Sequence, residues 1–147
     1  MKILLQRVTA GRVTVDGAIV GEIGRGYVAL VGIGGGDTED DARRMADKTV
    51  RLRVFADEQG KMNRSAADVH GEILAISQFT LYADTRKGQR PGFTNAAPPD
   101  LARPLFDAYT AALRRELGDD RVKTGVFGAS MQVDIFNDGP VTIMLES

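Results

Sequence analysis

A ridge of large apolar side chains recurs every four residues between positions 101 and 117. Its members are Leu101, Leu105, Tyr109, Leu113 and Leu117, with Ala108 and Ala112 beside them. Because residues four apart lie on one face of an α-helix, this spacing predicts a helix with a buried face. Prolines at positions 98 and 99 suit the helix start, and Gly118 suits its end. Such a helix has to pack against another layer of structure, most simply a sheet.

Most of the other apolar runs have the pattern of β-strands. They cover residues 3–8, 13–15, 18–23, 27–31 and 73–81 before the ridge, and 122–127, 131–136 and 141–145 after it. Asp16-Gly17 is a strong hairpin signal, because glycine tolerates a positive φ. Thr38 and Asp41 resemble a capping pair that opens a second helix. The element order predicts two helices on one face of a mixed or largely antiparallel sheet, with a second sheet or a partner subunit covering the remaining strands.

Composition restricts the chemistry that this chain can use. It has 147 residues, which fits one domain over residues 1–147, with no cysteine and a single histidine. The net charge of -1 argues against a general nucleic-acid coat protein but leaves a local contact open. No segment approaches the roughly 20 apolar residues that cross a bilayer, and the start lacks a signal-peptide core. We therefore expect a cytoplasmic protein with no membrane partner, no metal site and no cofactor.

Three features that could carry chemistry have simpler interpretations. Residues 32–37 (Gly-Ile-Gly-Gly-Gly-Asp) lack the spacing of a phosphate-binding loop and end in an acid, so a tight turn is favoured. His70 has no second histidine or cysteine to share a metal, and a solvent-facing turn is expected. The cations Arg86, Lys87 and Arg90 form either a solvated surface or a phosphate-contact loop.

Two polar runs follow apolar strands. Residues 77–80 (Ser-Gln-Phe-Thr) end the strand that begins at residue 73, and no obvious base accompanies their hydroxyls. On composition alone, a polar strand end is favoured there. Residues 137–140 (Asn-Asp-Gly-Pro) are typical of a hairpin turn between the last two strands. Only about 5–6% of X-Pro bonds in folded proteins are cis, so general physics favours a trans bond.

Six runs taken together resemble one family from end to end. They are residues 6–9 (QRVT), 60–63 (GKMN), 77–81 (SQFTL), 90–93 (RPGF), 131–133 (MQV) and 137–142 (NDGPVT). The chain resembles the D-aminoacyl-tRNA deacylases, or D-tyrosyl-tRNA deacylases, in the order and spacing of these runs and has no long insertion. One departure is Gly92, where serine is frequent in the family.

The resemblance implies a three-layer α/β/β fold with two main helices and mixed, mostly antiparallel sheets. It implies a homodimer with two active sites at the subunit interface. The reaction would be hydrolysis of the ester that joins a D-amino acid to the terminal adenosine of tRNA, releasing free D-amino acid and tRNA. Wrongly attached glycine would be removed in the same way. The binding partner would be the acceptor end of aminoacyl-tRNA.

The resemblance also implies a catalytic group of four residues: Ser77, Gln78, Phe79 and Thr80. Main-chain N–H groups around Phe79 would stabilise the developing oxyanion, while Ser77 and Gln78 orient the aminoacyl and ribose groups. Thr80 would be a supporting hydroxyl rather than a nucleophile. The 2′-hydroxyl of the terminal adenosine would assist hydrolysis, which accounts for the missing base.

A second group would select the chirality of the substrate. Gly139 and Pro140, joined by a cis bond in the family, would enter the other subunit's pocket and crowd the space of an L side chain. Arg7 matches the residue that supports their orientation. Met131 and Val133, from the matching run at residues 131–133, would bind substrate.

Two other functions remain open from the residues. One is a dimer that binds nucleotides or nucleic acid without catalysis. The other is a small-molecule hydrolase with a serine or threonine nucleophile, which predicts a covalent intermediate and near-total loss of activity in Thr80→Ala.

Overall fold

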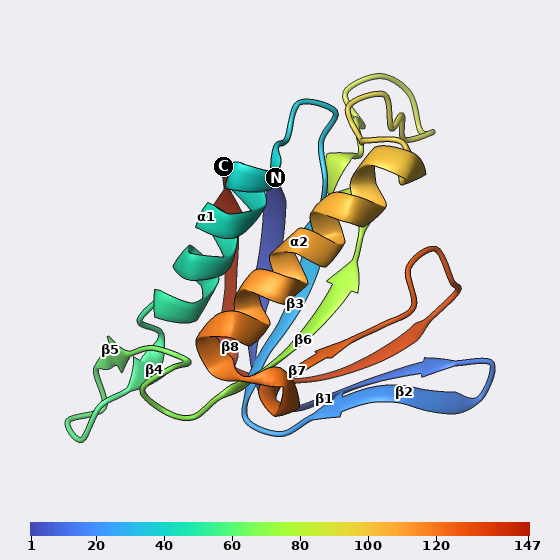
Figure 1. The fold of residues 1–147 in the computed structure, drawn as a ribbon. Helices are drawn as coiled ribbons and strands as arrows, with labels where there is room; N and C mark the ends of the chain where they lie inside the picture. Colours follow the sequence, from blue (N-terminus) through green and yellow to red (C-terminus); the bar gives the residue numbers. More distant parts are fainter.

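Two α-helices lie on one face of a bent sheet in the computed structural model, which describes all of residues 1–147 (Figure 1). The elements are β1 (Lys2–Val15), β2 (Ala18–Ile23), β3 (Gly26–Gly32), α1 (Glu39–Arg51), β4 (Phe55–Ala56), β5 (Met62–Arg64), β6 (Glu72–Ser77), the 3₁₀ helix η1 (Phe79–Tyr82), α2 (Pro99–Leu117), the 3₁₀ helix η2 (Asp119–Arg121), β7 (Val122–Thr124) and β8 (Gln132–Glu146). The main sheet has the order β2-β1-β3-β6-β7, and β8 pairs with β1. Only the pairs β3–β6 and β6–β7 are parallel, so the sheet is mixed and mostly antiparallel.

Both predicted helices are present. Leu105, Tyr109, Leu113 and Leu117 of the ridge lie on the buried face of α2, whereas Leu101 is 38% exposed, and Gly118 ends this helix. Thr38 and Asp41 form a capping box at the start of α1, which satisfies main-chain donors of the first turn. The hydroxyls of Thr49 on α1 and Tyr109 on α2 lie 3.0 Å apart in the buried contact between the helices. The two helices therefore form one packed layer.

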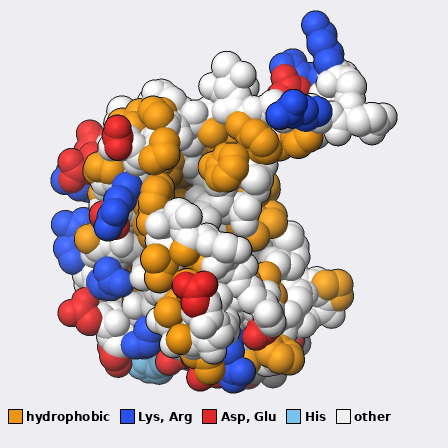
Figure 2. Space-filling model, turned by 90° about the vertical axis from the view of Figure 1, so that its right-hand side faces the viewer, with side chains coloured by type: hydrophobic (Ala, Val, Ile, Leu, Met, Phe, Trp, Pro, Cys, Tyr) orange, Lys and Arg blue, Asp and Glu red, His pale blue; other side chains and the backbone are white.

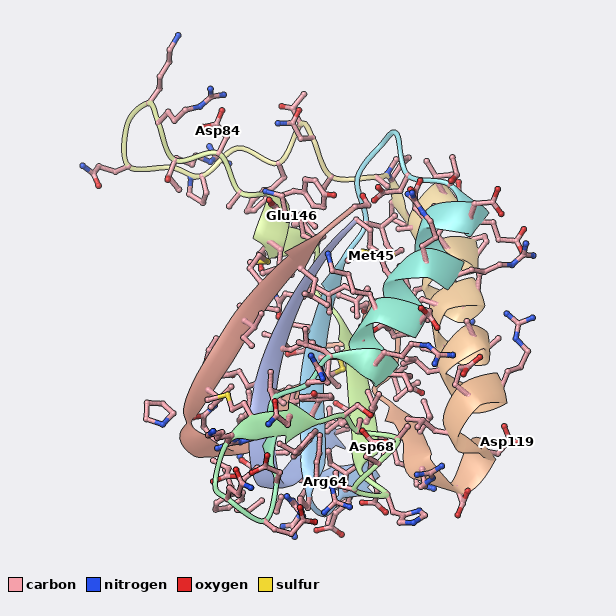
Figure 3. The ribbon with its side chains drawn as sticks, turned by 90° about the vertical axis from the view of Figure 1, so that its left-hand side faces the viewer. Met45, Arg64, Asp68, Asp84, Asp119 and Glu146 are labelled. Atoms are coloured by element: carbon pink, nitrogen blue, oxygen red, sulfur yellow. The ribbon has the colours of Figure 1, made fainter.

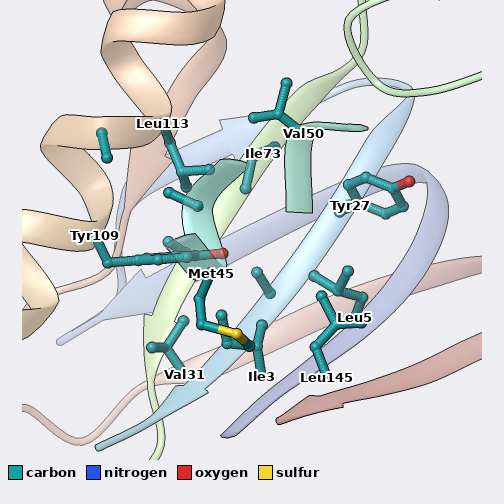
Figure 4. Close-up of a cluster of buried hydrophobic side chains, with 14 of the residues drawn as sticks. Ile3, Leu5, Tyr27, Val31, Met45, Val50, Ile73, Tyr109, Leu113 and Leu145 are labelled. Carbon is teal, nitrogen blue, oxygen red and sulfur yellow. The ribbon is translucent and has the colours of Figure 1, made fainter. Parts of the chain in front are cut away.

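Two hydrophobic cores lie on opposite faces of the central strands. Tyr27 and Val31 of β3 and Ile73 of β6 pack under the helices, as Figure 4 shows. The residues between them point the other way, because side chains alternate along a strand. The second core contains Val8, Val13, Ile23, Val28, Leu74 and Ile76. Its cover comes from β2, the far half of β1 and the first part of β8, where Val133 and Ile135 pack against it, so the layers are α/β/β and the second β layer belongs to this same chain.

The long first strand corrects one predicted boundary. Residues 3–8 and 13–15 were expected as separate strands, but they form one continuous β1. Gly11 does not interrupt it; the glycine is needed there because a Cβ at this position would lie 2.7 Å from Cγ2 of Val28. The chain bends here without losing its pairing to β8. This bend folds the second β layer over the first.

Three further predicted boundaries were wrong, and one of them is the strand expected over residues 122–127, which ends at Thr124 as β7. The strand expected over residues 73–81 ends at Ser77, because β3 ends at Gly32 and offers no further ladder partner. Phe79–Tyr82 is the 3₁₀ helix η1 instead. Residues 137–140 are not a hairpin turn, since they lie within β8, which pairs with β1 on both sides of a shift in register.

Several turns agree with the sequence. Asp16 and Gly17 have φ values of 49° and 79° and link β1 to β2 in a hairpin. The glycines at 34–36 lie in a turn, and His70 is an exposed turn residue. None of the helices has both the length and the apolar character that crossing a membrane requires.

Candidate active site

The polar run at residues 77–80 forms a sharp corner where β6 gives way to η1. The main-chain N–H of Gln78 donates to the carbonyl of Val31 at 2.8 Å. The next two N–H groups, of Phe79 and Thr80, have no acceptor in the protein. A helix leaves its first donors without internal partners, and here nothing caps them. The corner therefore offers two adjacent main-chain donors to an anion or to a developing oxyanion.

An apolar cavity of about 630 Å³ lies beside this corner. Figure 2 shows hydrophobic side chains gathered around a hollow on this face of the molecule. Ser77, Gln78 and Phe79 line the cavity, and Met131 and Val133 line it from the start of β8 and the residue before it. Five predicted site residues from two distant segments therefore meet in one place.

The lining of the cavity limits its chemistry. Twelve of its 17 lining residues are hydrophobic, and none of the 17 carries a titratable side chain. The cavity can hold a flat or apolar group, with one hydroxyl and one amide side chain available to orient it. It contains no side chain that could serve as a general base at neutral pH.

Thr80 does not line the cavity. Its exposed hydroxyl accepts a hydrogen bond from the side-chain amide of Gln78. A carboxamide nitrogen cannot take up the proton of a hydroxyl, so this contact does not activate Thr80 as a nucleophile. The contact instead ties the Gln78 side chain to the first turn of η1.

Sequence reasoning missed part of the cavity wall. Phe93 packs edge-to-face on Phe79, with ring centroids 4.9 Å apart and an interplanar angle of 67°. Phe127 and the start of α2, including Pro98 and Ala102, complete the wall. Phe93 lies in one of the family-like runs, which was the available signal for it. No sequence signal pointed to the other three, since ordinary apolar residues become a wall only through packing.

The second motif forms a bulge in the middle of β8. The Gly139–Pro140 peptide bond is cis, as the family resemblance implies and against the general preference. Gly139 has a φ of 142°, and a Cβ there would lie 2.7 Å from Val141. Asn137 brackets the bulge: its side chain accepts from the N–H of Val141 and donates to the carbonyl of Val141, each at 3.2 Å. These side-chain bonds replace ladder bonds that the bulge interrupts.

Arg7 holds this bulge against the rest of the protein. Its Nε lies 3.1 Å from both the carbonyl oxygen and Oδ2 of Asp138. Its Nη1 donates to the carbonyl of Val54, and only 14% of the Arg7 side chain is exposed. One guanidinium thus links β1, the segment before β4, and the residue that precedes Gly139.

Within one chain the two motifs do not share a cavity. The apolar cavity is not lined by Gly139, Pro140 or Arg7. Ser77 pairs with Val31, which pairs with Ile3, whereas Asn137 pairs with Val8. Five residues along β1 correspond to roughly 17 Å. The corner and the bulge are therefore separate features of one chain, and both Gly139 and Pro140 are exposed.

Solved structures share this fold. One described as "c-Myc DNA Unwinding Element Binding Protein" matches with a TM-score of 0.95 and 45% identity, covering 100% of this chain and 99% of that chain. Another, "Structural Analysis of a probable eukaryotic D-amino acid tRNA deacylase", matches with a TM-score of 0.85 and 19% identity, covering 98% and 97%. At 19% identity, the second match speaks for the fold alone.

Sequence comparisons identify the class. The family model described as D-Tyr-tRNA(Tyr) deacylase matches residues 4–146. The D-aminoacyl-tRNA deacylase of Heliobacterium modesticaldum is 60% identical over 146 residues, which is 99% of this chain and 96% of that protein. With its exposed main-chain donors beside a cavity, the chain is an enzyme of the deacylase class, a hydrolase of ester bonds. It belongs to the D-Tyr-tRNA(Tyr) deacylase family.

Proposed function

We propose that this protein hydrolyses the ester bond of D-aminoacyl-tRNA, releasing the free D-amino acid and tRNA. It also removes glycine wrongly attached to tRNA, and so acts in translation quality control. The observation that carries the proposal is the pair of free N–H groups at Phe79 and Thr80 beside a cavity without a titratable side chain. A single domain, residues 1–147, carries out this reaction. It acts in the cytoplasm, where the tRNA substrate is found.

The reaction follows from this corner. Water adds to the carbonyl carbon of the ester, and the carbonyl oxygen becomes an oxyanion that accepts from the two free N–H groups. The bond from carbon to the ribose oxygen then breaks, and that oxygen takes up one proton, which balances the proton that the attacking water has lost. Removing one preorganised donor of this kind costs about 100- to 1,000-fold in kcat in known hydrolases. Ser77 and Gln78 orient the aminoacyl and ribose groups, and Met131 and Val133 form the opposite wall.

The substrate supplies the proton relay that the cavity lacks: the 2′-hydroxyl of the terminal adenosine accepts a proton from the attacking water and passes its own proton to the leaving ribose oxygen. The 2′-hydroxyl of the terminal adenosine lies next to the ester in any aminoacyl-tRNA, so it is positioned without cost to the protein. Thr80 supports Gln78 instead of attacking the substrate. This assignment explains why a hydrolase can work without histidine, lysine or a carboxylate in its cavity.

Chirality is selected across a homodimer interface. Gly139 and Pro140 of one subunit enter the cavity of the other, and their main-chain carbonyls crowd the space of an L side chain while holding the α-amino group. Two observations support this arrangement. Neither Gly139 nor Pro140 lines the cavity of its own chain, and Phe136 and Met144 on the same strand are 61% and 45% exposed. Exposed apolar residues of this kind mark interaction surfaces.

One comparison of substrates tests the proposal. The purified protein is incubated with D- and L-tyrosyl-tRNA, with glycyl-tRNA, and with D-tyrosyl-tRNA that ends in 2′-deoxyadenosine. We expect turnover of the D and glycyl forms, survival of the L form, and severe loss on the deoxy form. Equal hydrolysis of D and L forms would refute chiral selection, and full activity on the deoxy form would refute RNA assistance.

A second candidate function is nucleic-acid binding without catalysis. The observation that favours it is the described name of the 45% identical structure, which is that of a DNA-binding protein. Binding of tRNA with no release of D-tyrosine would support this candidate over the hydrolase. A third reading, a hydrolase with a Thr80 nucleophile, is disfavoured because the Thr80 hydroxyl contacts only an amide.

A further inference from the structure

A basic loop projects from the rim of the candidate active site. It leaves the end of η1 and returns to Phe93, and Figure 3 shows it extending from the body of the protein around Asp84. Two main-chain hydrogen bonds close its base: the N–H of Asp84 donates to the carbonyl of Gly92 at 2.7 Å, and the N–H of Gly92 donates to that of Asp84 at 2.9 Å. These bonds close the loop on itself shortly after η1, whose first turn carries the free N–H groups.

The three cations of this loop are not equivalent. The Arg86 guanidinium binds the carboxylate of Asp84 in a two-pronged contact, with distances of 2.9 and 2.6 Å. Lys87 and Arg90 are exposed and have neither an ion-pair partner nor a hydrogen bond. Within a chain whose net charge is -1, these two side chains present uncompensated positive charge at one place.

These cations border a second, polar cavity of about 600 Å³. Its other lining residues are Asp84, whose carboxylate is paired with Arg86, and Gly92, Thr94 and Asn95, and none of its lining residues is hydrophobic. A polar cavity with free cations and uncharged donors is suited to phosphate oxygens rather than to an apolar ligand.

The polar and apolar cavities are two sides of one chain segment, residues 92–97. Phe93, Ala96 and Ala97 line the apolar cavity, whereas Gly92, Thr94 and Asn95 line the polar one. A strand of nucleic acid whose terminal nucleotide occupies the apolar cavity would pass this segment and enter the polar cavity with its next phosphates.

We propose that the polar cavity binds the phosphodiester backbone of the substrate RNA directly upstream of the terminal nucleotide. Lys87 and Arg90 contact phosphate oxygens, while Arg86 is held by Asp84 and organises the loop. This inference rests on the proposed function, because it takes an aminoacyl-tRNA as the occupant of the neighbouring cavity. As a consequence, the polar cavity recognises the charge of the RNA backbone and does not distinguish between base sequences.

The test compares two substrates that differ in their phosphates. D-tyrosyl-tRNA carries the upstream backbone, and D-tyrosyl-adenosine carries none. For the Lys87→Ala/Arg90→Ala variant, we expect the ratio of kcat/KM on tRNA to kcat/KM on the adenosine ester to fall roughly two- to thirtyfold. The matched control is Lys48→Ala/Arg115→Ala, which removes the same charge from exposed, unpaired positions on the two helices. We expect its ratio to equal that of the wild type.

A binding measurement separates this inference from the proposed function. The affinity for uncharged tRNA is measured at several salt concentrations, which needs no catalysis. Each lost phosphate contact should reduce the slope of log affinity against log salt by about 0.7, giving a total change near 1.4 for the double variant. An unchanged slope, or an equal change in the control variant, would overturn the phosphate assignment. If the wild type hydrolyses neither ester but the slopes still differ, the proposed function fails and the phosphate site stands.

Discussion

Removing Arg7 should lower both the free energy of unfolding and the preference for D- over L-aminoacyl substrate. The Arg7 guanidinium donates to the carbonyls of Val54 and Asp138, and so holds the bulge that carries Gly139 and Pro140. Arg7→Ala removes both donors without adding a new group. Arg7→Lys keeps the charge but has one nitrogen, which cannot reach two carbonyls in the way that a planar guanidinium does.

The size of the effect follows from the burial of each partner. Val54 is 5% exposed, so its carbonyl loses a charged donor in a place that water reaches poorly, which costs about 1–3 kcal/mol. The Asp138 side chain is 40% exposed, and water can replace its contact at a cost of at most about 1 kcal/mol. We therefore expect Arg7→Ala to lower the free energy of unfolding by between about 1 and 4 kcal/mol, and Arg7→Lys to lie between this variant and the wild type.

Urea unfolding measures the first part, and hydrolysis of D- and L-tyrosyl-tRNA measures the second. If the bulge selects chirality, a bulge without its support should let the L form react, so the preference for D over L should fall in Arg7→Ala. Arg12→Ala is the matched control, since Arg12 lies on the same strand and pairs only with exposed Glu22. Its loss should stay below about 1 kcal/mol. If Arg7→Ala unfolds like Arg12→Ala and keeps the wild-type preference for D, the supporting role of Arg7 is wrong.

Four other substitutions probe three separate features. Thr80→Ala should keep kcat within about tenfold of wild type, because only one hydrogen bond is lost. Loss of a covalent nucleophile would instead lower kcat about a million-fold. Single-turnover kinetics distinguishes these two outcomes. Thr49→Val should lower the free energy of unfolding by about 1–3 kcal/mol, because it leaves the buried Tyr109 hydroxyl without a partner. Tyr109→Phe should lower it by about 1 kcal/mol or less, because the Thr49 hydroxyl still donates to the carbonyl of Met45 one turn earlier. Urea unfolding measures both variants, and equal losses would contradict this reasoning. Hydrogen bonds from Thr38 lower the pKa of Asp41 to about 2, so Asp41 stabilises the folded state above about pH 3.8, and that stability is lost as the pH falls through 2. In Thr38→Ala the pKa of Asp41, followed by NMR, should rise toward its ordinary value, and an unchanged titration would show that Thr38 is not the cause.

Local patterns predicted most of the secondary structure. The four-residue ridge predicted α2, and the capping pair at Thr38 predicted the start of α1. Such signals depend on a few neighbouring residues, and so they are present in the chain itself. The errors fell where a distant partner decides the outcome. The strand expected to reach residue 81 ends at Ser77, because its neighbour β3 ends, and nothing within residues 73–81 records that.

The candidate site was predicted unevenly for the same reason. The runs at residues 77–80 and 131–133 were chosen for their resemblance to a family, and packing brings five of those residues to one cavity. The free N–H groups were implied by that resemblance, yet their availability depends on η1, which no pattern in the sequence predicted. Phe127 and Ala102 were missed because an apolar side chain looks the same in a core and in a cavity wall.

The sequence by itself determined most of the helices and strands, the absence of thiol chemistry, and the six runs that resemble the family. The tertiary structure decided what two of these runs present: residues 77–80 form a corner with two unpaired main-chain donors, and residues 137–140 form a bulge held by Arg7. It also decided which cations near the rim are free, since only the folded loop brings Asp84 onto Arg86 and leaves Lys87 and Arg90 without partners. The physical reason is that a hydrogen-bonding group is defined by what remains unsatisfied after folding, and that depends on contacts between residues far apart in the chain.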